Sequence, residues 1–215
     1  MGNDLFKFQN CDSVTKCQYL TQKLLDQNQA FSALDQLAIL TCLRKEIGDQ
    51  ITAQVDVIPS LLQSTPLLSL VTQVLSLDAA NMDPIARYLQ LEASWILTNL
   101  TYGSAEDTEI ILTQSPQIFD FLNNVLLSDD HQMIEQVLWI ISNASAESVR
   151  LRNLVLTRTN VLAAMKRFEE QVKTKGTMRV GLVNNILWCI RSMCKSKDPA
   201  GDQMTLQRLT RQEQD

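Results

Sequence analysis

Three tryptophans carry the strongest chemical signal in this sequence, because each is followed one helical turn later by a small polar residue. The segments are Trp95-Ile-Leu-Thr-Asn99, Trp139-Ile-Ile-Ser-Asn143 and Trp188-Cys-Ile-Arg-Ser192. Residues four apart lie on the same face of a helix, so each indole is expected beside its amide or hydroxyl. An indole face attracts ammonium and guanidinium groups, and an asparagine amide can both donate to and accept from a peptide backbone. The pattern predicts a surface that binds an extended basic peptide.

The spacing of these tryptophans indicates an internal repeat. Trp139 follows Trp95 by 44 residues, and Trp188 follows Trp139 by 49. Helical arrays of the armadillo and HEAT type recur about every 40 to 47 residues. No alternating run of apolar residues or Asn-Gly hairpin signal competes with the helical pattern. We therefore expect an all-α fold, a right-handed superhelical solenoid of about four repeats.

Helical periodicity and capping residues predict the elements that position the tryptophans. Helices are expected over residues 13–27, 31–47, 49–57, 59–77, 84–101, 105–113, 116–127, 132–144, 146–156, 160–173 and 178–194. The third helices of three repeat units would be those near 84–101, 132–144 and 178–194. Gly48 is expected to cap the end of its helix. The domain organisation expected is an N-terminal extension (1–12), a solenoid (13–199) and a polar C-terminal tail (200–215).

Composition argues against several classes of function. The 215 residues carry a formal net charge of -5, with a pI near 5.0, whereas nucleic-acid-binding domains normally carry a basic face. The only histidine is His131, and the sequence holds no Gly-x-Ser-x-Gly motif and no glycine-rich phosphate loop. No apolar run reaches the 18 or more residues typical of a membrane span. We expect no enzymatic activity, catalytic residue, cofactor, nucleic-acid partner or membrane span.

The cysteines favour a reducing environment. There are five, Cys11, Cys17, Cys42, Cys189 and Cys194, with no Cys-x-x-Cys pair. Their odd number and their place in apolar helical patterns favour buried reduced thiols over metal ligands. The sequence therefore predicts no metal site and an intracellular protein, in the cytoplasm, the nucleus or both.

The segment from Glu92 to Gly103 resembles the second armadillo repeat of importin-α, the adaptor that binds nuclear localisation signals. Glu135 to Asn143 resembles the third repeat of that family, and Asn184 to Pro199 resembles the fourth. The family carries a basic arm ahead of its repeats, whereas the first 27 residues here hold only three lysines. The likeness covers residues 84–199 well and 13–83 loosely. It implies a truncated member that lacks the importin-β-binding arm and the later repeats.

The resemblance also implies a set of peptide-binding residues. It places Gly103 and Thr108 around the main lysine pocket, Gln136 against the peptide and Glu147 against a lysine, and Ser192 stands where the family has its third asparagine. The full set is Trp95, Asn99, Gly103, Thr108, Gln136, Trp139, Asn143, Glu147, Trp188 and Ser192. The partner implied is a protein with a Lys/Arg-rich segment.

Two alternatives stay open at this point. The tryptophans could simply fill space between repeats, since aromatic residues at helical spacing are usually core. The chain could also be a structural or scaffold subunit that descends from an importin-α-like protein and binds other subunits of a larger complex. That second alternative predicts large apolar patches on the terminal helices.

Overall fold

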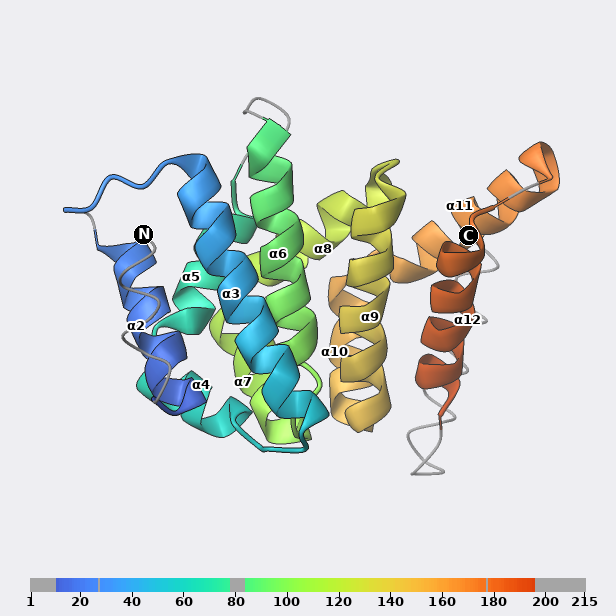
Figure 1. The fold of residues 1–215 in the computed structure, drawn as a ribbon. Helices are drawn as coiled ribbons and strands as arrows, with labels where there is room; N and C mark the ends of the chain where they lie inside the picture. The colour runs from blue at the N-terminus through green and yellow to red at the C-terminus, as the bar shows by residue number, and fades with distance from the viewer. Residues whose placement is uncertain (1–10, 27, 78–83, 177, 196–215) are drawn as a thin grey trace. The chain divides into compact units, whose positions relative to one another are not determined.

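The computed structural model describes residues 11–26, 28–77, 84–176 and 178–195. Within these residues the chain consists of α-helices joined by turns and loops, and no strand occurs among them (Figure 1). The expected all-α fold is confirmed. The chain divides into two units, residues 1–103 and 104–215. The expected tail 200–215 and most of the expected extension 1–12 lie outside the described residues, and the superhelical twist stays a prediction.

The first unit is a stack of helices in which α3 and α6 pack against each other. Its helices are α2 (Ser13–Leu25), α3 (Ala33–Thr52), α4 (Ile58–Ser64), α5 (Leu67–Leu75) and α6 (Pro84–Leu100). α2 packs on α3, and α5 packs on α6. The helices meet through apolar side chains that are almost completely buried, among them Leu40, Leu43, Ile47, Leu67, Val71, Ile96 and Leu97. This burial holds α6, which carries Trp95, in place.

Three of the helices expected in the first unit differ from the structure. Gly48 does not end a helix, because α3 continues to Thr52. The separate helix expected over residues 49–57 does not occur, since its first residues belong to α3 and residues 53–57 are not helical. The single helix expected from Pro59 to Leu77 is broken between Ser64 and Leu67. Pro66 explains the break, since proline has no N–H to donate and the residue before it is pushed out of the helical region. Thr65 accordingly has the extended angles φ -129° and ψ 149°.

The second unit stacks helices in the same way, with α9 packed on both α10 and α12. Its helices are α7 (Ala105–Gln114), α8 (Gln117–Leu127), α9 (His131–Glu147), α10 (Val149–Arg158), α11 (Val161–Lys175) and α12 (Val180–Cys194). Short polar residues begin several of them. Ser104 and Asp107 form a reciprocal capping box at α7, and Asp130 accepts from the main-chain N–H of Met133 at α9. Gly176 ends α11 in the left-handed conformation, φ 70°.

The cysteines are free thiols in different environments. Cys17 and Cys189 are buried, as expected, and burial raises the pKa of each thiol to about 12. Cys11 and Cys42 are partly exposed. Cys194, the last residue of α12, is exposed, against expectation.

Taken singly, none of the described helices has both the length and the apolar character that a bilayer crossing requires. The α4 and α5 pair, bent by 85°, meets the same criteria of length and composition when the two are taken together.

Candidate functional site

Helix α6 is buried on almost every side except one narrow strip. Between Leu91 and Leu100, Trp95 is exposed, Glu92 and Asn99 are partly exposed, and the residues between them are buried. The indole of Trp95 is 40% exposed. Positions i, i+3 and i+7 share one helix face, so a carboxylate, an indole and an amide follow one another along the surface. We call this set the α6 strip.

Helix α9 of the second unit repeats the same order of groups. Glu135, Trp139 and Asn143 stand one turn apart, and Glu147 is the last residue of the helix. Trp139 is 42% exposed, whereas its neighbours Leu138 and Ile140 are completely buried. Glu147 is exposed at the negative end of the helix dipole, where a cation is favoured. We call Glu135, Trp139, Asn143 and Glu147 the α9 strip.

Trp188 lies on α12, which packs against α9. Its indole is 46% exposed. The three tryptophans are therefore not core residues that fill space between helices, because each keeps two fifths or more of its side-chain surface accessible. The packing alternative that the sequence left open does not fit this exposure.

The remaining residues implied by the resemblance are less accessible. Thr108 is completely buried, and Gln136 and Ser192 are also buried. Gly103 is partly exposed at the end of the first unit. Ser192 occupies the position on α12 that Asn143 has on α9, but a buried hydroxyl presents no clamp at the surface.

Arginines that sequence reasoning missed pair with an acidic residue of each strip. In the first unit, Arg44 Nε donates to Glu92 Oε2 at 2.6 Å, and its guanidinium carbon lies 5.7 Å from the centre of the Trp95 ring. In the second unit, Arg179 and Glu135 approach to 3.8 Å. The one local signal in the sequence was an acidic residue three or four positions before each of the first two tryptophans.

The Glu135 carboxylate depends on a glycine in the neighbouring helix. A Cβ at Gly181 of α12 would stand 3.1 Å from Glu135 Oε1, which is tighter than ordinary contact. The absence of a side chain there gives the carboxylate its place beside α12. Within the described ranges, no group of three or more His, Cys, Asp or Glu side chains is placed to hold a metal ion.

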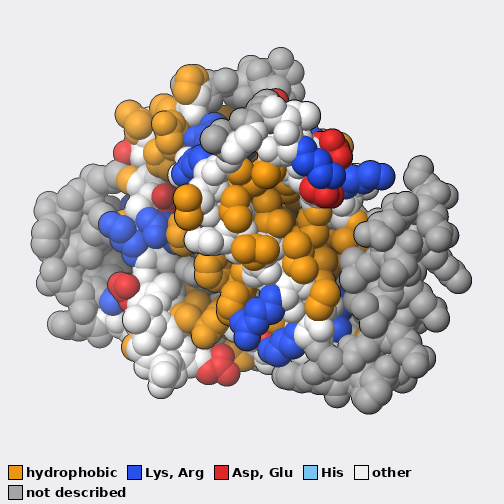
Figure 2. Space-filling model, turned by 90° about the vertical axis from the view of Figure 1, so that its right-hand side faces the viewer, with side chains coloured by type: hydrophobic (Ala, Val, Ile, Leu, Met, Phe, Trp, Pro, Cys, Tyr) orange, Lys and Arg blue, Asp and Glu red, His pale blue; other side chains and the backbone are white. Residues whose placement is uncertain are grey.

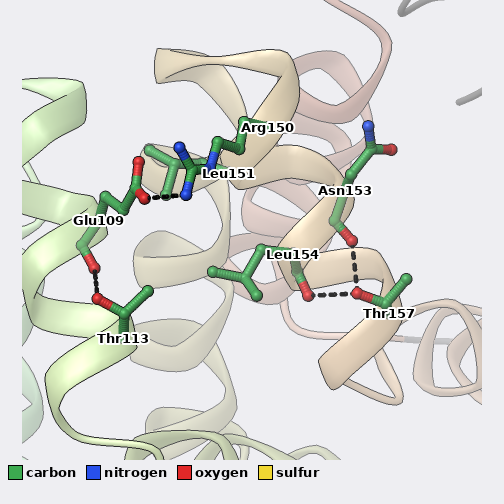
Figure 3. Close-up of a pocket in the computed structure, with 7 residues that line it drawn as sticks. All are labelled: Glu109, Thr113, Arg150, Leu151, Asn153, Leu154 and Thr157. Carbon is green, nitrogen blue, oxygen red and sulfur yellow. Dashed lines mark hydrogen bonds and ion pairs between the residues drawn. The ribbon is translucent and has the colours of Figure 1, made fainter.

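A separate pocket of about 280 Å³ lies between α7 and α10 in the second unit (Figure 3). It is lined by Glu109, Thr113, Arg150, Leu151, Asn153, Leu154 and Thr157. Arg150 and Glu109 form an ion pair of 2.6 Å across its mouth, with most of the arginine side chain in solvent. The threonines bond to main-chain oxygens of their own helices. None of the residues predicted from the sequence lines this pocket, and we assign it no ligand.

The face of the molecule that carries α11 and α12, at the right of Figure 1, has an apolar middle. Figure 2 shows hydrophobic side chains gathered in the middle of this face, with Lys and Arg side chains at its edges. Leu187 is 59% exposed there, although Leu138, its counterpart one repeat earlier on α9, is completely buried. Val180, Ile190 and Val172 are exposed as well. A face of this kind normally contacts another helix.

Comparison with known proteins points to one group of relatives. No family model matches the chain. Importin subunit alpha-2 of Arabidopsis thaliana is 27% identical over 117 residues, which is 54% of this chain and 20% of the relative. Importin subunit alpha-6 of the same plant is 28% identical over 116 residues, with the same two shares. Importin subunit alpha-2 of Caenorhabditis elegans is 28% identical over 133 residues, 62% of this chain and 23% of the relative. The chain thus spans about a fifth of the length of the curated relatives it matches.

Proposed function

We propose, from the premise that this chain is an importin-α-like armadillo protein, that it is a non-enzymatic adaptor whose strips bind extended Lys/Arg-rich peptide segments. The site residues in direct contact would be Trp95, Asn99, Trp139, Asn143, Glu147 and Trp188. Thr108, Gln136 and Ser192 would act from beneath the surface, and Gly103 would leave room at the end of α6. We expect such an adaptor to act inside the cell, in the cytoplasm, the nucleus or both.

The observation that carries this proposal is the repeated order of acid, indole and amide on the accessible face of two otherwise buried helices. Burying a tryptophan side chain stabilises a fold by several kcal/mol, so an indole that is left 40% exposed forgoes part of that gain. A lysine or arginine stem laid on such an indole gains apolar contact and cation–π attraction of about 0.5 to 2 kcal/mol. The following asparagine can bond the ligand's main chain without reading its sequence.

Electrostatics support a basic ligand. The α9 strip begins with Glu135 and ends with Glu147 at the carbonyl end of the helix, where cations are favoured. The whole chain carries a formal net charge of -5. Salt weakens the attraction between exposed charges, so binding of a lysine-rich peptide should fall as ionic strength rises.

The test is calorimetric titration of the full chain with the peptide Lys-Lys-Lys-Arg-Lys. We expect a dissociation constant in the micromolar range or below, which added salt weakens and the double variant Trp139→Ala, Asn143→Ala raises about tenfold or more. Leu127→Ala is the matched control, because this exposed apolar residue belongs to α8 and to neither strip. A folded chain that fails to bind the peptide, or a double variant that binds as well as the parent, would refute the proposal.

A scaffold function is the second candidate, and the apolar outer face of α11 and α12 favours it. Arg179, Arg191 and Lys195 are exposed residues in or next to α12, and α12 holds no acidic residue. The occupant of this face would be an amphipathic helix of another subunit with acidic residues beside its apolar stripe. A designed helical peptide of that pattern should bind, and the Leu187→Gln, Ile190→Gln variant should lose the binding. Equal binding of a peptide with basic flanks would contradict this second candidate.

A further inference from the structure

Arg44 of α3 lies within the α6 strip and contacts the groups that we propose for a ligand. Its guanidinium carbon is 5.7 Å from the centre of the Trp95 ring, within the range of a cation–π contact. Its Nε donates to the Glu92 carboxylate at 2.6 Å. Both side chains of this ion pair are largely shielded from solvent, with 27% and 18% of their surface exposed. Such shielding strengthens the pair relative to a fully exposed one.

The main chain of the same residue engages the third group of the strip. Asn99 Nδ2 donates to the carbonyl oxygen of Arg44 at 3.4 Å. Gly48 lies one turn further along α3, where a Cβ would stand 3.4 Å from Asn99 Nδ2, so α3 and α6 approach each other closely at this point. Arg44 therefore contacts all three groups of the strip. Its side chain contacts the indole and the carboxylate, and its main-chain oxygen accepts from the amide.

We infer that Arg44 is a built-in occupant of the α6 strip, which a basic ligand must displace before it contacts Trp95 and Asn99, whereas the α9 strip can be entered directly. The consequence for ligands rests on the proposed function. A lysine arriving at Trp95 would have to displace the guanidinium, or else lie beside a like charge. The competitor is part of the same unit, so its effective concentration is high and independent of protein concentration.

Trp139 and Trp188 differ from Trp95 in their contacts with basic side chains. Among the described residues, no lysine or arginine lies over the Trp139 ring. Arg191 lies 4.7 Å from the centre of the Trp188 ring, but it comes from the same helix three residues later and is itself exposed. A contact of this kind is readily exchanged for a ligand contact. Arg44, by contrast, is held by a neighbouring helix and by the Glu92 ion pair.

The first test measures whether Arg44 shields Trp95 from cations and needs no peptide. In the full chain with Trp139→Phe and Trp188→Phe, the fluorescence reports Trp95 alone. Its quenching by caesium ion is compared with quenching by neutral acrylamide, before and after Arg44→Met, which keeps an apolar stem. We expect the caesium-to-acrylamide ratio to rise about twofold or more in Arg44→Met.

Lys45→Met is the matched control, since it removes the same charge from the next residue of α3, whose side chain is exposed. It should raise the ratio much less. Glu92→Gln removes the ion pair but keeps Arg44. Its caesium-to-acrylamide ratio should lie between those of the parent and Arg44→Met. An equal ratio in Arg44→Met and Lys45→Met would overturn the inference.

The second test separates this inference from the proposed function. In the Trp139→Ala, Asn143→Ala background, Arg44→Met should restore binding of Lys-Lys-Lys-Arg-Lys by about 3- to 10-fold, and Lys45→Met should not. If Arg44→Met opens Trp95 to caesium but no version of the chain binds peptide, the proposed function fails and the occupancy by Arg44 stands. If the parent binds peptide and Arg44→Met changes neither readout, the inference about Arg44 fails alone.

Discussion

Arg152 of α10 donates from Nη2 to the main-chain oxygen of Lys195, at the end of α12. Its Nε donates to the main-chain oxygen of Ser145 in the last turn of α9, at 3.2 Å. The side chain is 2% exposed, so one buried guanidinium joins the carbonyl ends of two helices that carry candidate site tryptophans. Cations are favoured at these helix ends, and each bond satisfies an oxygen that the helix leaves open.

Replacing Arg152 with methionine should therefore destabilise the second unit. Loss of charge-assisted bonds to buried carbonyl oxygens costs about 2 to 4 kcal/mol in the free energy of unfolding. Urea unfolding followed by circular dichroism measures the change. Arg150→Met is the control on the same helix, because its ion pair with Glu109 is largely in solvent and should contribute less than about 1 kcal/mol. Equal effects of the two substitutions would contradict the assigned role of Arg152.

Arg167 of α11 should have a similar role at the end of α8. Its Nη1 donates to Leu127 O, and its Nη2 donates to Leu126 O and Ser128 O, each at 2.8 Å. Lysine keeps the charge but not the planar fork, so Arg167→Lys should lower the free energy of unfolding by about 1 to 2 kcal/mol. Amide hydrogen exchange should also quicken in the last turn of α8. Lys166→Met, at the exposed neighbouring position, should leave that exchange unchanged.

The buried thiols should make the protein less stable at alkaline pH. Burial raises the pKa of the Cys189 thiol from 9.0 to about 12, and burial followed by the nearby Glu46 does the same for Cys17. At pH values between 9.0 and about 12, the thiols of the folded chain keep protons that those of the unfolded chain have lost. The stabilisation is therefore complete below pH 9 and is lost as pH rises toward 12, by up to about 1.4 kcal/mol per pH unit for each thiol.

Unfolding in urea at pH 8, 9.5 and 10.5 measures this loss. In Cys189→Ala, the free energy of unfolding should fall less steeply with pH than in the parent chain. The difference between the two slopes isolates the contribution of this thiol. An identical slope would show that Cys189 does not contribute. Cys194 is exposed and serves as the control, since Cys194→Ala should leave the slope unchanged.

Gly48 should tolerate one added carbon atom and no more. A Cβ at this position would stand 3.4 Å from Asn99 Nδ2, which is ordinary contact, and alanine is the better helix former. Gly48→Ala should therefore stabilise the chain by about 0.5 to 1 kcal/mol. Gly48→Leu should instead displace Asn99 from Arg44 O and destabilise it by about 1 to 3 kcal/mol. Thermal unfolding distinguishes the two, and a stabilising leucine would contradict the close approach of α3 and α6.

Much of the helical pattern could be predicted because its causes are local. Ser104 and Asp107 cap α7 within one turn, and Pro84 begins α6 as its fixed φ favours. Pro66 is also a local signal, because a proline inside a helical pattern breaks the helix, as it does within residues 59–77. Gly48 was different. Its local preference indicates a helix end, but α3, whose buried side chains include the preceding Ile47, continues to Thr52.

The candidate site could be predicted only in part. Tryptophan followed by asparagine at i+4 places both on one face by helix geometry alone, and Trp95 and Asn99 do share the α6 strip. That geometry does not say which face is accessible, because accessibility depends on what the neighbouring helices cover. Ser192 shows the difference, since it occupies the same local position as Asn143 and yet is buried.

The sequence by itself determined the all-α character, the repeat period and the presence of indole and polar groups on shared helix faces. These depend on interactions between residues within a few turns of one another. Only the tertiary structure decided that Arg44, which is 51 residues from Trp95 in the chain, contacts its ring, and that Arg152 joins the ends of α9 and α12. Contacts of this range follow from helix packing, which depends on the sum of many small apolar contacts rather than on any local signal.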